Sequence, residues 1–150
     1  MVSRGTIDDF LAQRSLALAG VSRDGTGFGN NVLKELNGKG YTLHLVHPAV
    51  ESIAGLPCVK RLADVAGKVG GLVLVTPPEQ SVKLCHEAAA AGITRVWMQQ
   101  GAESEEAIRV CGEKGISVVH GHCILMFAEP AAFPHRVHRW LKRVGGSLPQ

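Results

Sequence analysis

The side chains with the clearest chemical potential lie in a glycine-rich turn between Gly20 and Asn30. The turn reads GVSRDGTGFGN, follows a short apolar run and precedes a segment with helical spacing of apolar residues. Such a turn leaves main-chain N–H groups unpaired at the start of a helix, where the helix dipole favours an anion. Glycines let the main chain approach phosphate oxygens, and Ser22 and Arg23 can add hydrogen bonds. The turn therefore predicts a phosphate site, with a purely structural turn as the alternative.

The turn differs from two common nucleotide-binding motifs. It is not G-x-G-x-x-G, and Thr26 stands where the G-x-x-x-x-G-K motif needs a lysine. Dinucleotide-binding folds also place an acid near the end of the second strand, where it accepts hydrogen bonds from a ribose. Here that segment ends in Val46, His47 and Pro48, and the next acid is Glu51. NAD is therefore disfavoured.

The elements that must position these residues alternate between short apolar runs and helical segments. Buried strands are expected at Leu16–Gly20, Thr42–Val46, Gly71–Val75, Arg95–Gln99 and Ile116–His120. Helices are expected from a cap at Thr6, over 31–37, near 61–66, after a cap at Thr76, after Ser104 and over 134–144. This alternation predicts an α/β, Rossmann-like three-layer fold with a five-stranded parallel sheet in the order 3-2-1-4-5. The ligand crevice should lie at the carboxyl ends of strands one and four.

Size and composition fit one such domain over residues 1–150. Hydrophobic residues make up 45%, charged residues 19% and aromatic residues 5%, and the net charge is +3. This charge is too small to predict nucleic-acid binding. The chain has four cysteines without C-x-x-C spacing, no signal-peptide pattern and no long apolar run, so we expect a cytoplasmic protein outside the membrane.

The basic segment from His135 to Arg143 is interpreted as the solvated face of a final helix. A polyanion site is one alternative for this segment, and docking to a partner or to a second copy of the chain, and hence a homo-oligomer, is another.

Four motifs in order, LALAGVSRDGTGFGN, LVTPP, VWMQQGAESEEAI and VVHGHC, resemble the small stand-alone coenzyme A-binding domain family. These Rossmann-like proteins are related to the coenzyme A-binding domain of the succinyl-CoA synthetase α subunit. The resemblance covers roughly residues 6–127. It implies binding of coenzyme A or an acyl-CoA, a small-molecule nucleotide cofactor.

The resemblance also implies the residues of the site. The diphosphate would lie on the turn, the adenosine beside the second strand, and the pantetheine arm on the far side of the crevice. The implied residues are Gly20, Ser22, Arg23, Asp24, Gly29, Asn30, Val46, His47, Pro48, Thr76, Pro77, Pro78, Met98, Gln99 and Gln100. The family often has a basic residue just after the second strand, where this chain has Ala49 and Val50; Lys60 or Arg61 are the substitutes we consider.

Chemistry at the site is expected to be limited to binding. His120, His122 and Cys123 are possible metal ligands, but strand alternation separates them and we expect no metal. Cys123 is interpreted as a packing residue, with a mixed disulfide to the cofactor thiol as the alternative. We find no G-x-S-x-G motif or spaced carboxylate pair. A carrier or sensor is therefore favoured over an NAD(P)-dependent oxidoreductase or an acyl-CoA ligase subunit, and the acyl group stays open.

Overall fold

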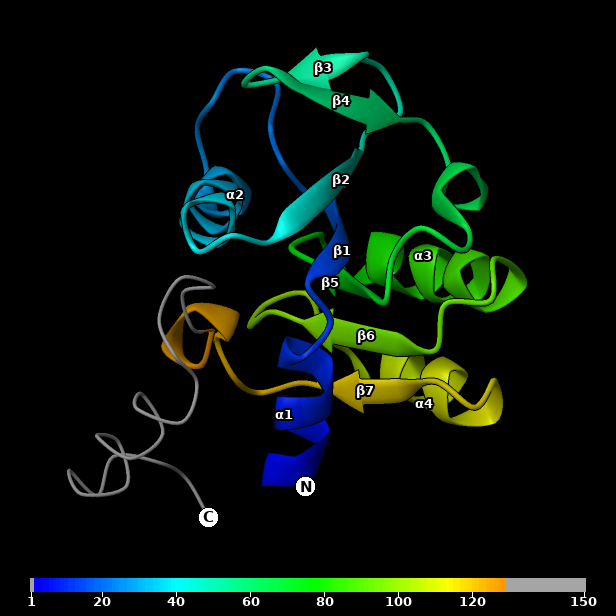
Figure 1. The fold of residues 1–150 in the computed structure, drawn as a ribbon. Helices are drawn as coiled ribbons and strands as arrows, with labels where there is room; N and C mark the ends of the chain where they lie inside the picture. Colours follow the sequence, from blue (N-terminus) through cyan, green and yellow to red (C-terminus); the bar gives the residue numbers. More distant parts are fainter. Residues whose placement is uncertain (1, 129–150) are drawn as a thin grey trace, which may run out of the picture.

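A computed structural model describes residues 2–128 and shows a parallel sheet covered by helices on both faces (Figure 1). The strands are β1 (Ser15–Ala19), β2 (Thr42–Val46), β3 (Ser52–Ile53), β4 (Leu56–Val59), β5 (Gly71–Leu74), β6 (Arg95–Met98) and β7 (Ser117–Val119). They form one sheet in the order β3-β4-β2-β1-β5-β6-β7. All neighbours are parallel except β3, which is antiparallel to β4. The expected α/β, Rossmann-like architecture is confirmed.

The expected strand count and order are wrong, because the sheet has seven strands within residues 2–128 and two of them, β3 and β4, were not expected. The third apolar run became β5, which pairs with β1, whereas the place outside β2 is taken by β4. That strand contains Pro57 and has no fully buried side chain, so it lacks the apolar pattern of a central strand. With β4 counted third in the chain, the six parallel strands follow 3-2-1-4-5-6, the Rossmann order.

Within residues 2–128, four α-helices and two short 3-10 helices accompany the strands. They are α1 (Arg4–Leu11), α2 (Phe28–Gly38), η1 (Leu62–Val65), α3 (Pro78–Ala90), α4 (Glu105–Glu113) and η2 (Ile124–Met126), with α1 before β1 and η2 after β7. The expected helix near 61–66 is confirmed as η1, and the helix expected over 134–144 lies outside the described residues. None of the helices in the described part is long and apolar enough to cross a membrane.

Two of the three expected helix caps are wrong. Ser104 does cap α4, because its Oγ accepts a hydrogen bond from the Ala107 N–H at 3.1 Å. For α1 the cap is Ser3, whose Oγ accepts from the N–H of Thr6. The residue before α3 is Pro77, and the Thr76 hydroxyl instead forms a buried hydrogen bond with the side chain of Ser81.

Alternating strand residues build two hydrophobic layers, one on each face of the sheet. In β1, Leu16 and Leu18 pack with residues of α1 and α2, whereas Ala17 and Ala19 pack with residues of α3, α4 and η1. All four are buried. Because side chains alternate between faces along a strand, this doubly covered sheet explains the continuous apolar runs.

Candidate functional site

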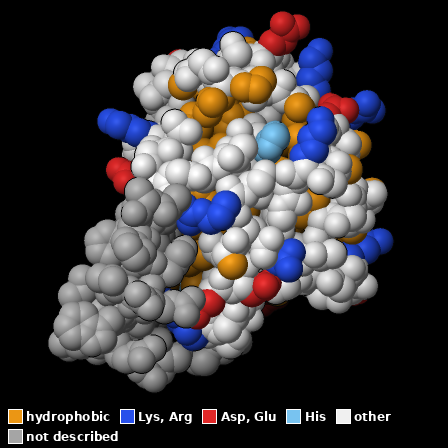
Figure 2. All heavy atoms as spheres, in the orientation of Figure 1, with side chains coloured by type: hydrophobic (Ala, Val, Ile, Leu, Met, Phe, Trp, Pro, Cys, Tyr) orange, Lys and Arg blue, Asp and Glu red, His pale blue; other side chains and the backbone are white. Residues whose placement is uncertain are grey.

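A pocket of about 350 Å³ lies at the carboxyl ends of β1, β2 and β5, beside the first turns of α3. In the upper half of Figure 2, where β2 ends in Figure 1, a histidine lies between exposed hydrophobic side chains and a lysine or arginine. The lining residues are Ala19, Gly20, Val21, Val46, His47, Pro48, Lys60, Val75, Thr76, Pro77, Gln80, Lys83, Leu84 and Glu87. This position corresponds to the crevice of Rossmann folds, but the strand that flanks it beside β1 is β5 and not the expected strand at Arg95–Gln99.

Two glycines bring the start of α2 against the sheet edge. Gly20 has φ +110°, and a Cβ there would lie 2.2 Å from the carbonyl oxygen of Val75. A Cβ on Gly29 would lie 2.2 Å from the carbonyl oxygen of Gly20. Both glycines therefore have a packing role, and this packing sets the first turn of α2 beside the pocket.

The turn between these glycines is fixed by an ionised carboxylate. Asp24 Oδ1 accepts hydrogen bonds from Ser22 Oγ at 2.5 Å, Thr26 Oγ1 at 2.7 Å and Thr26 N–H at 3.0 Å. These bonds, that from Ser22 first, lower the pKa of Asp24 from its ordinary 3.8 to about 2. The Ser22 hydroxyl and the Thr26 N–H therefore both donate to Asp24, and these bonds stabilise the conformation of the turn.

Asn30 holds the other end of the turn. Its Oδ1 accepts from the Ser22 N–H at 3.0 Å, and its Nδ2 donates to the Ser22 carbonyl at 2.9 Å. Gly27, the N-cap of α2, has no side chain that could cap the helix. Among the side chains of residues 2–128, none accepts a hydrogen bond from the N–H groups of Phe28 and Gly29 at this helix N-terminus. Arg23 is exposed on the same turn.

Six of the expected residues line the pocket together: Gly20, Val46, His47, Pro48, Thr76 and Pro77. Ser22, Arg23, Asp24, Gly29 and Asn30 form the adjoining turn and helix start, and Pro78 begins α3. The pocket thus joins segments that are more than fifty residues apart in the chain.

The three expected residues at the end of β6 lie apart from this group. Met98 and Gln99 are buried, Gln100 is exposed, and none of them lines the pocket, because β5 stands between β1 and β6. Gln99 Oε1 accepts from the Ile124 N–H at 2.6 Å, and its Nε2 donates to Cys123 Sγ at 3.4 Å. The Gln99 side chain therefore holds the segment after β7 against the end of β6. Contact of Gln99 with a pantetheine arm stays a prediction.

His47 has a fixed ring orientation at the pocket. Its Nδ1 accepts hydrogen bonds from the N–H groups of Ala49 at 3.0 Å and Val50 at 3.3 Å. A neutral imidazole that accepts at Nδ1 carries its proton at Nε2. His47 therefore offers an N–H donor from its other nitrogen.

Four lining residues of α3 were not singled out from the sequence: Gln80, Lys83, Leu84 and Glu87. Their spacing of three and four residues places them on one side of α3, which begins at the last proline of the Thr-Pro-Pro segment. That spacing was the sequence feature that could have identified them as pocket residues, but the same spacing is found in any amphipathic helix. Lys60, considered above as a substitute cation, does line the pocket.

Within residues 2–128, the remaining thiols and histidines are not among the residues that line the pocket. Cys85 on α3 and Cys111 on α4 are buried, with 3.4 Å between their Sγ atoms. His120 Nδ1 is 3.9 Å from Glu103 Oε2, which also accepts from the Gly121 N–H. Within residues 2–128 no group of three or more His, Cys, Asp or Glu side chains is placed to hold a metal ion.

The sheet order, the glycine turn and the pocket at the carboxyl edge define a Rossmann-like α/β protein. The chain belongs to the CoA-binding domain family, whose model, described as a CoA binding domain, matches residues 14–129. It is 28% identical over 124 residues to the uncharacterized protein YneT of Bacillus subtilis. This alignment covers 81% of this chain and 91% of YneT.

Solved structures extend this comparison. A conserved hypothetical protein from Pyrococcus furiosus has 34% identity and a TM-score of 0.71, over 75% of this chain and 97% of that chain. A dinucleotide-forming acetyl-coenzyme A synthetase from Ca. Korarchaeum cryptofilum has 23% identity and a TM-score of 0.62, over 71% of this chain but 25% of that chain. The second likeness shows a shared fold.

Proposed function

We propose that this chain binds coenzyme A or an acyl-CoA at the pocket and acts as a non-catalytic carrier or sensor. The observation that carries the proposal is the junction of the pocket with the glycine turn. Gly20 lines the pocket and also contacts Gly29 at the start of α2, in a chain of the CoA-binding domain family. One continuous surface thus offers a nucleotide pocket and a phosphate-binding helix start.

The described residues fit the nucleotide end of such a ligand. The uncapped first turn of α2 would receive the diphosphate, with Arg23 as an added cation. The adenosine would contact Val46, His47 and Pro48 on one side and Leu84 on the other, all of them lining residues.

The size of the pocket limits what it would enclose. Its volume of about 350 Å³ is at the small end of ligand pockets, which measure about 300–1,000 Å³. We therefore infer that only the nucleotide enters, and that the pantetheine arm extends along the carboxyl edge of the sheet toward Gln100. The thiol or thioester would then stay accessible, which suits a carrier or a sensor.

The thiols support a reducing compartment, which we propose is the cytoplasm. All four cysteines are free in the structure, including Cys85 and Cys111, whose Sγ atoms lie 3.4 Å apart. Disulfides are rare in reducing compartments, so four free thiols fit the cytoplasm.

A thermal-shift titration tests the proposed function. The purified chain is heated with coenzyme A, acetyl-CoA, NAD or ATP, and a ligand that binds only the folded state raises the melting temperature. At a free concentration of 100 Kd the added stability is about 2.7 kcal/mol. We expect both coenzyme A species to give the larger shifts. A shift with NAD and none with coenzyme A would reverse the assignment.

A further inference from the structure

We propose that Cys85 and Cys111 form a reversible disulfide between α3 and α4, and that this oxidation weakens ligand binding at the pocket. The pair is then a site of redox modification in a protein of a reducing compartment, where disulfides are usually transient and serve catalysis or redox sensing. Formation of the bond does not depend on the proposed function. Its effect on the pocket rests on that function.

The first observation is the position of the two thiols. The side chains of Cys85 and Cys111 are fully buried, and their Sγ atoms lie 3.4 Å apart. A disulfide has about 2.05 Å between its sulfur atoms, so the two sulfurs must approach by about 1.3 Å. Helices α3 and α4 pack against each other on one face of the sheet (Figure 1). Rotation of the two side chains and a small shift of either helix can therefore close the gap.

The second observation is the direction of the hydrogen bond between the thiols. Cys111 donates its S–H to the sulfur of Cys85. This bond lowers the pKa of Cys85, whereas the same bond and burial raise the pKa of Cys111. The thiolate is the nucleophile in thiol chemistry. Cys85 is therefore the thiol that reacts with an oxidant, and Cys111 is the thiol that resolves the product.

The oxidant that fits this buried pair is hydrogen peroxide, which is small enough to reach a thiol during a brief local opening of the packing. The Cys85 thiolate attacks one peroxide oxygen, the O–O bond breaks, and a sulfenic acid and hydroxide form. The Cys111 thiol then attacks the oxidised sulfur, the S–S bond forms, and the hydroxyl leaves with the thiol proton as water. Together the two thiols give two electrons and two protons to one peroxide, which becomes two molecules of water.

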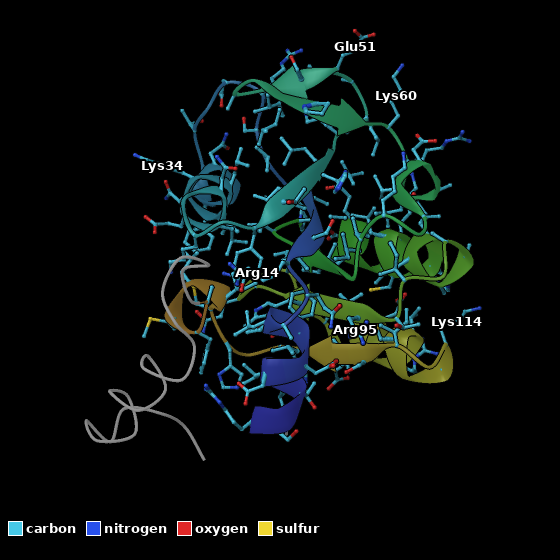
Figure 3. All side chains as sticks on the ribbon, viewed as in Figure 1. Arg14, Lys34, Glu51, Lys60, Arg95 and Lys114 are labelled. Atoms are coloured by element: carbon cyan, nitrogen blue, oxygen red, sulfur yellow. The ribbon has the colours of Figure 1, made fainter. Side chains whose placement is uncertain are left out.

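The third observation links the pair to the pocket. Cys85 directly follows Leu84, one of the four residues of α3 that line the pocket. On one side α3 packs against α4, and on the other it packs against η1, which follows β4. In Figure 3, Lys60, a lining residue after β4, and Lys114, at the end of α4, lie on opposite sides of α3. A bond to α4 therefore draws α3 away from the ends of β2 and β4 and widens the pocket between them.

The first experiment asks whether the bond forms in the folded chain. The wild-type chain is incubated with hydrogen peroxide, the remaining thiols are blocked, and the chain is digested with trypsin without reductant. We expect residues 84–95 and 110–114, the tryptic peptides that contain the two cysteines, as one disulfide-linked species in the mass spectrum. Absence of this species, or its formation only after addition of urea, would overturn the proposal.

The melting temperature measures how firmly the bond ties the two helices. The bond joins residues 26 positions apart, so the oxidised chain should melt roughly 5–15 °C higher than the reduced chain, and dithiothreitol should reverse the shift. The matched control is Cys123→Ser, which removes a partly exposed thiol, keeps the pair and should show the same shift. Cys111→Ala, compared with its own untreated form, should show none. An unchanged melting temperature in the oxidised wild type would overturn the tether.

Isothermal titration calorimetry tests the effect on the pocket. The ligand is acetyl-CoA, because the free thiol of coenzyme A would reduce the bond. The oxidised chain should bind about two- to tenfold more weakly than the reduced chain, the value of one ordinary contact, and dithiothreitol should restore the affinity. Peroxide-treated Cys111→Ala should bind like its untreated form.

The outcomes separate this inference from the proposed function. Equal affinities of the oxidised and reduced wild type would overturn the effect on the pocket. Failure of the reduced chain to bind either acetyl-CoA or coenzyme A would overturn the proposed function. The disulfide itself would still stand on the linked peptides and the melting temperature, which are measured without any ligand.

Discussion

Gly29 is the residue at which the smallest change should have the largest structural effect. An added Cβ would lie 2.2 Å from the Gly20 carbonyl oxygen, which belongs to the backbone and cannot swing aside. Overpacking of this kind costs roughly 1–3 kcal/mol or more. We expect Gly29→Ala to lower the free energy of unfolding by at least that amount in a urea titration.

Gly112 provides the matched control for that substitution. It lies inside α4, and a Cβ there would meet nothing within 4 Å. Gly112→Ala should raise stability by about 0.5–1 kcal/mol, because alanine loses less backbone entropy in a helix. If both variants changed stability equally, the close approach of α2 to β1 would be wrong.

Asp24 should titrate far below an ordinary aspartate. Its folded pKa of about 2 lies below the ordinary 3.8, so its contribution to stability is present above pH 3.8 and is lost as pH falls through about 2. A carboxyl-detected NMR titration should find this midpoint. Ser22→Ala removes the first cause of the shift and should move the midpoint back toward 3.8. A normal midpoint in the wild type would contradict the hydrogen-bonded turn.

At the scale of single residues, the sequence identified the glycines and the hydrogen-bond donors of the turn between Gly20 and Asn30. It did not identify which acceptors those donors bind. The turn was recognisable from its composition between a strand and a helix. That Asn30 would bind Ser22, and that Asp24 would take the Ser22 hydroxyl, depends on the path of the turn. Several side-chain pairings satisfy such a turn equally well, so the sequence does not choose among them.

At the scale of elements, helices α3 and α4 meet through a pair of thiols. Cys85 and Cys111 are fully buried, and the neighbouring thiol and burial raise the pKa of Cys111 well above its ordinary range. Cys111 should resist alkylation in the native chain because the thiolate is the reactive form, and Cys85 should resist it because its side chain is buried away from the reagent. Cys123, which is partly exposed, serves as the internal comparison.

Timed alkylation followed by peptide mass spectrometry measures this difference. We expect the peptide containing Cys123 to be modified first and those containing Cys85 and Cys111 only when the chain unfolds. Fast modification of Cys85 under native conditions would show that α3 and α4 separate readily.

The sequence predicted the strands that are buried on both faces and missed β3 and β4, which are not. The strands β1, β2, β5, β6 and β7 each match an apolar run to within a residue or two. Strand β4 was not predicted because it contains Pro57 and because Leu56 and Cys58 are only partly buried, a pattern typical of a loop. The order followed from that omission, since one missing strand displaced β5 from the position beside β1.

For the whole molecule, the order of strands in the sheet explains which residues, far apart in the chain, could be assigned to one pocket from the sequence. The carboxyl ends of β1, β2 and β5 are adjacent, so residues placed after those strands do meet at one pocket. Residues after β6 lie one strand further away. The part of the pocket supplied by α3 was not predicted, because which helix face looks toward the crevice depends on how the helix packs on the sheet.

The central claim is that the first-turn amides of α2 hold a diphosphate next to the pocket. The most direct measurement is an amide ¹H–¹⁵N NMR titration of the labelled chain with coenzyme A. We expect the largest shifts at Gly27, Phe28 and Gly29 and in the pocket lining, with little change at the opposite edge around Lys114. Saturable shifts that leave Gly27–Gly29 unmoved and cluster elsewhere would contradict the claim.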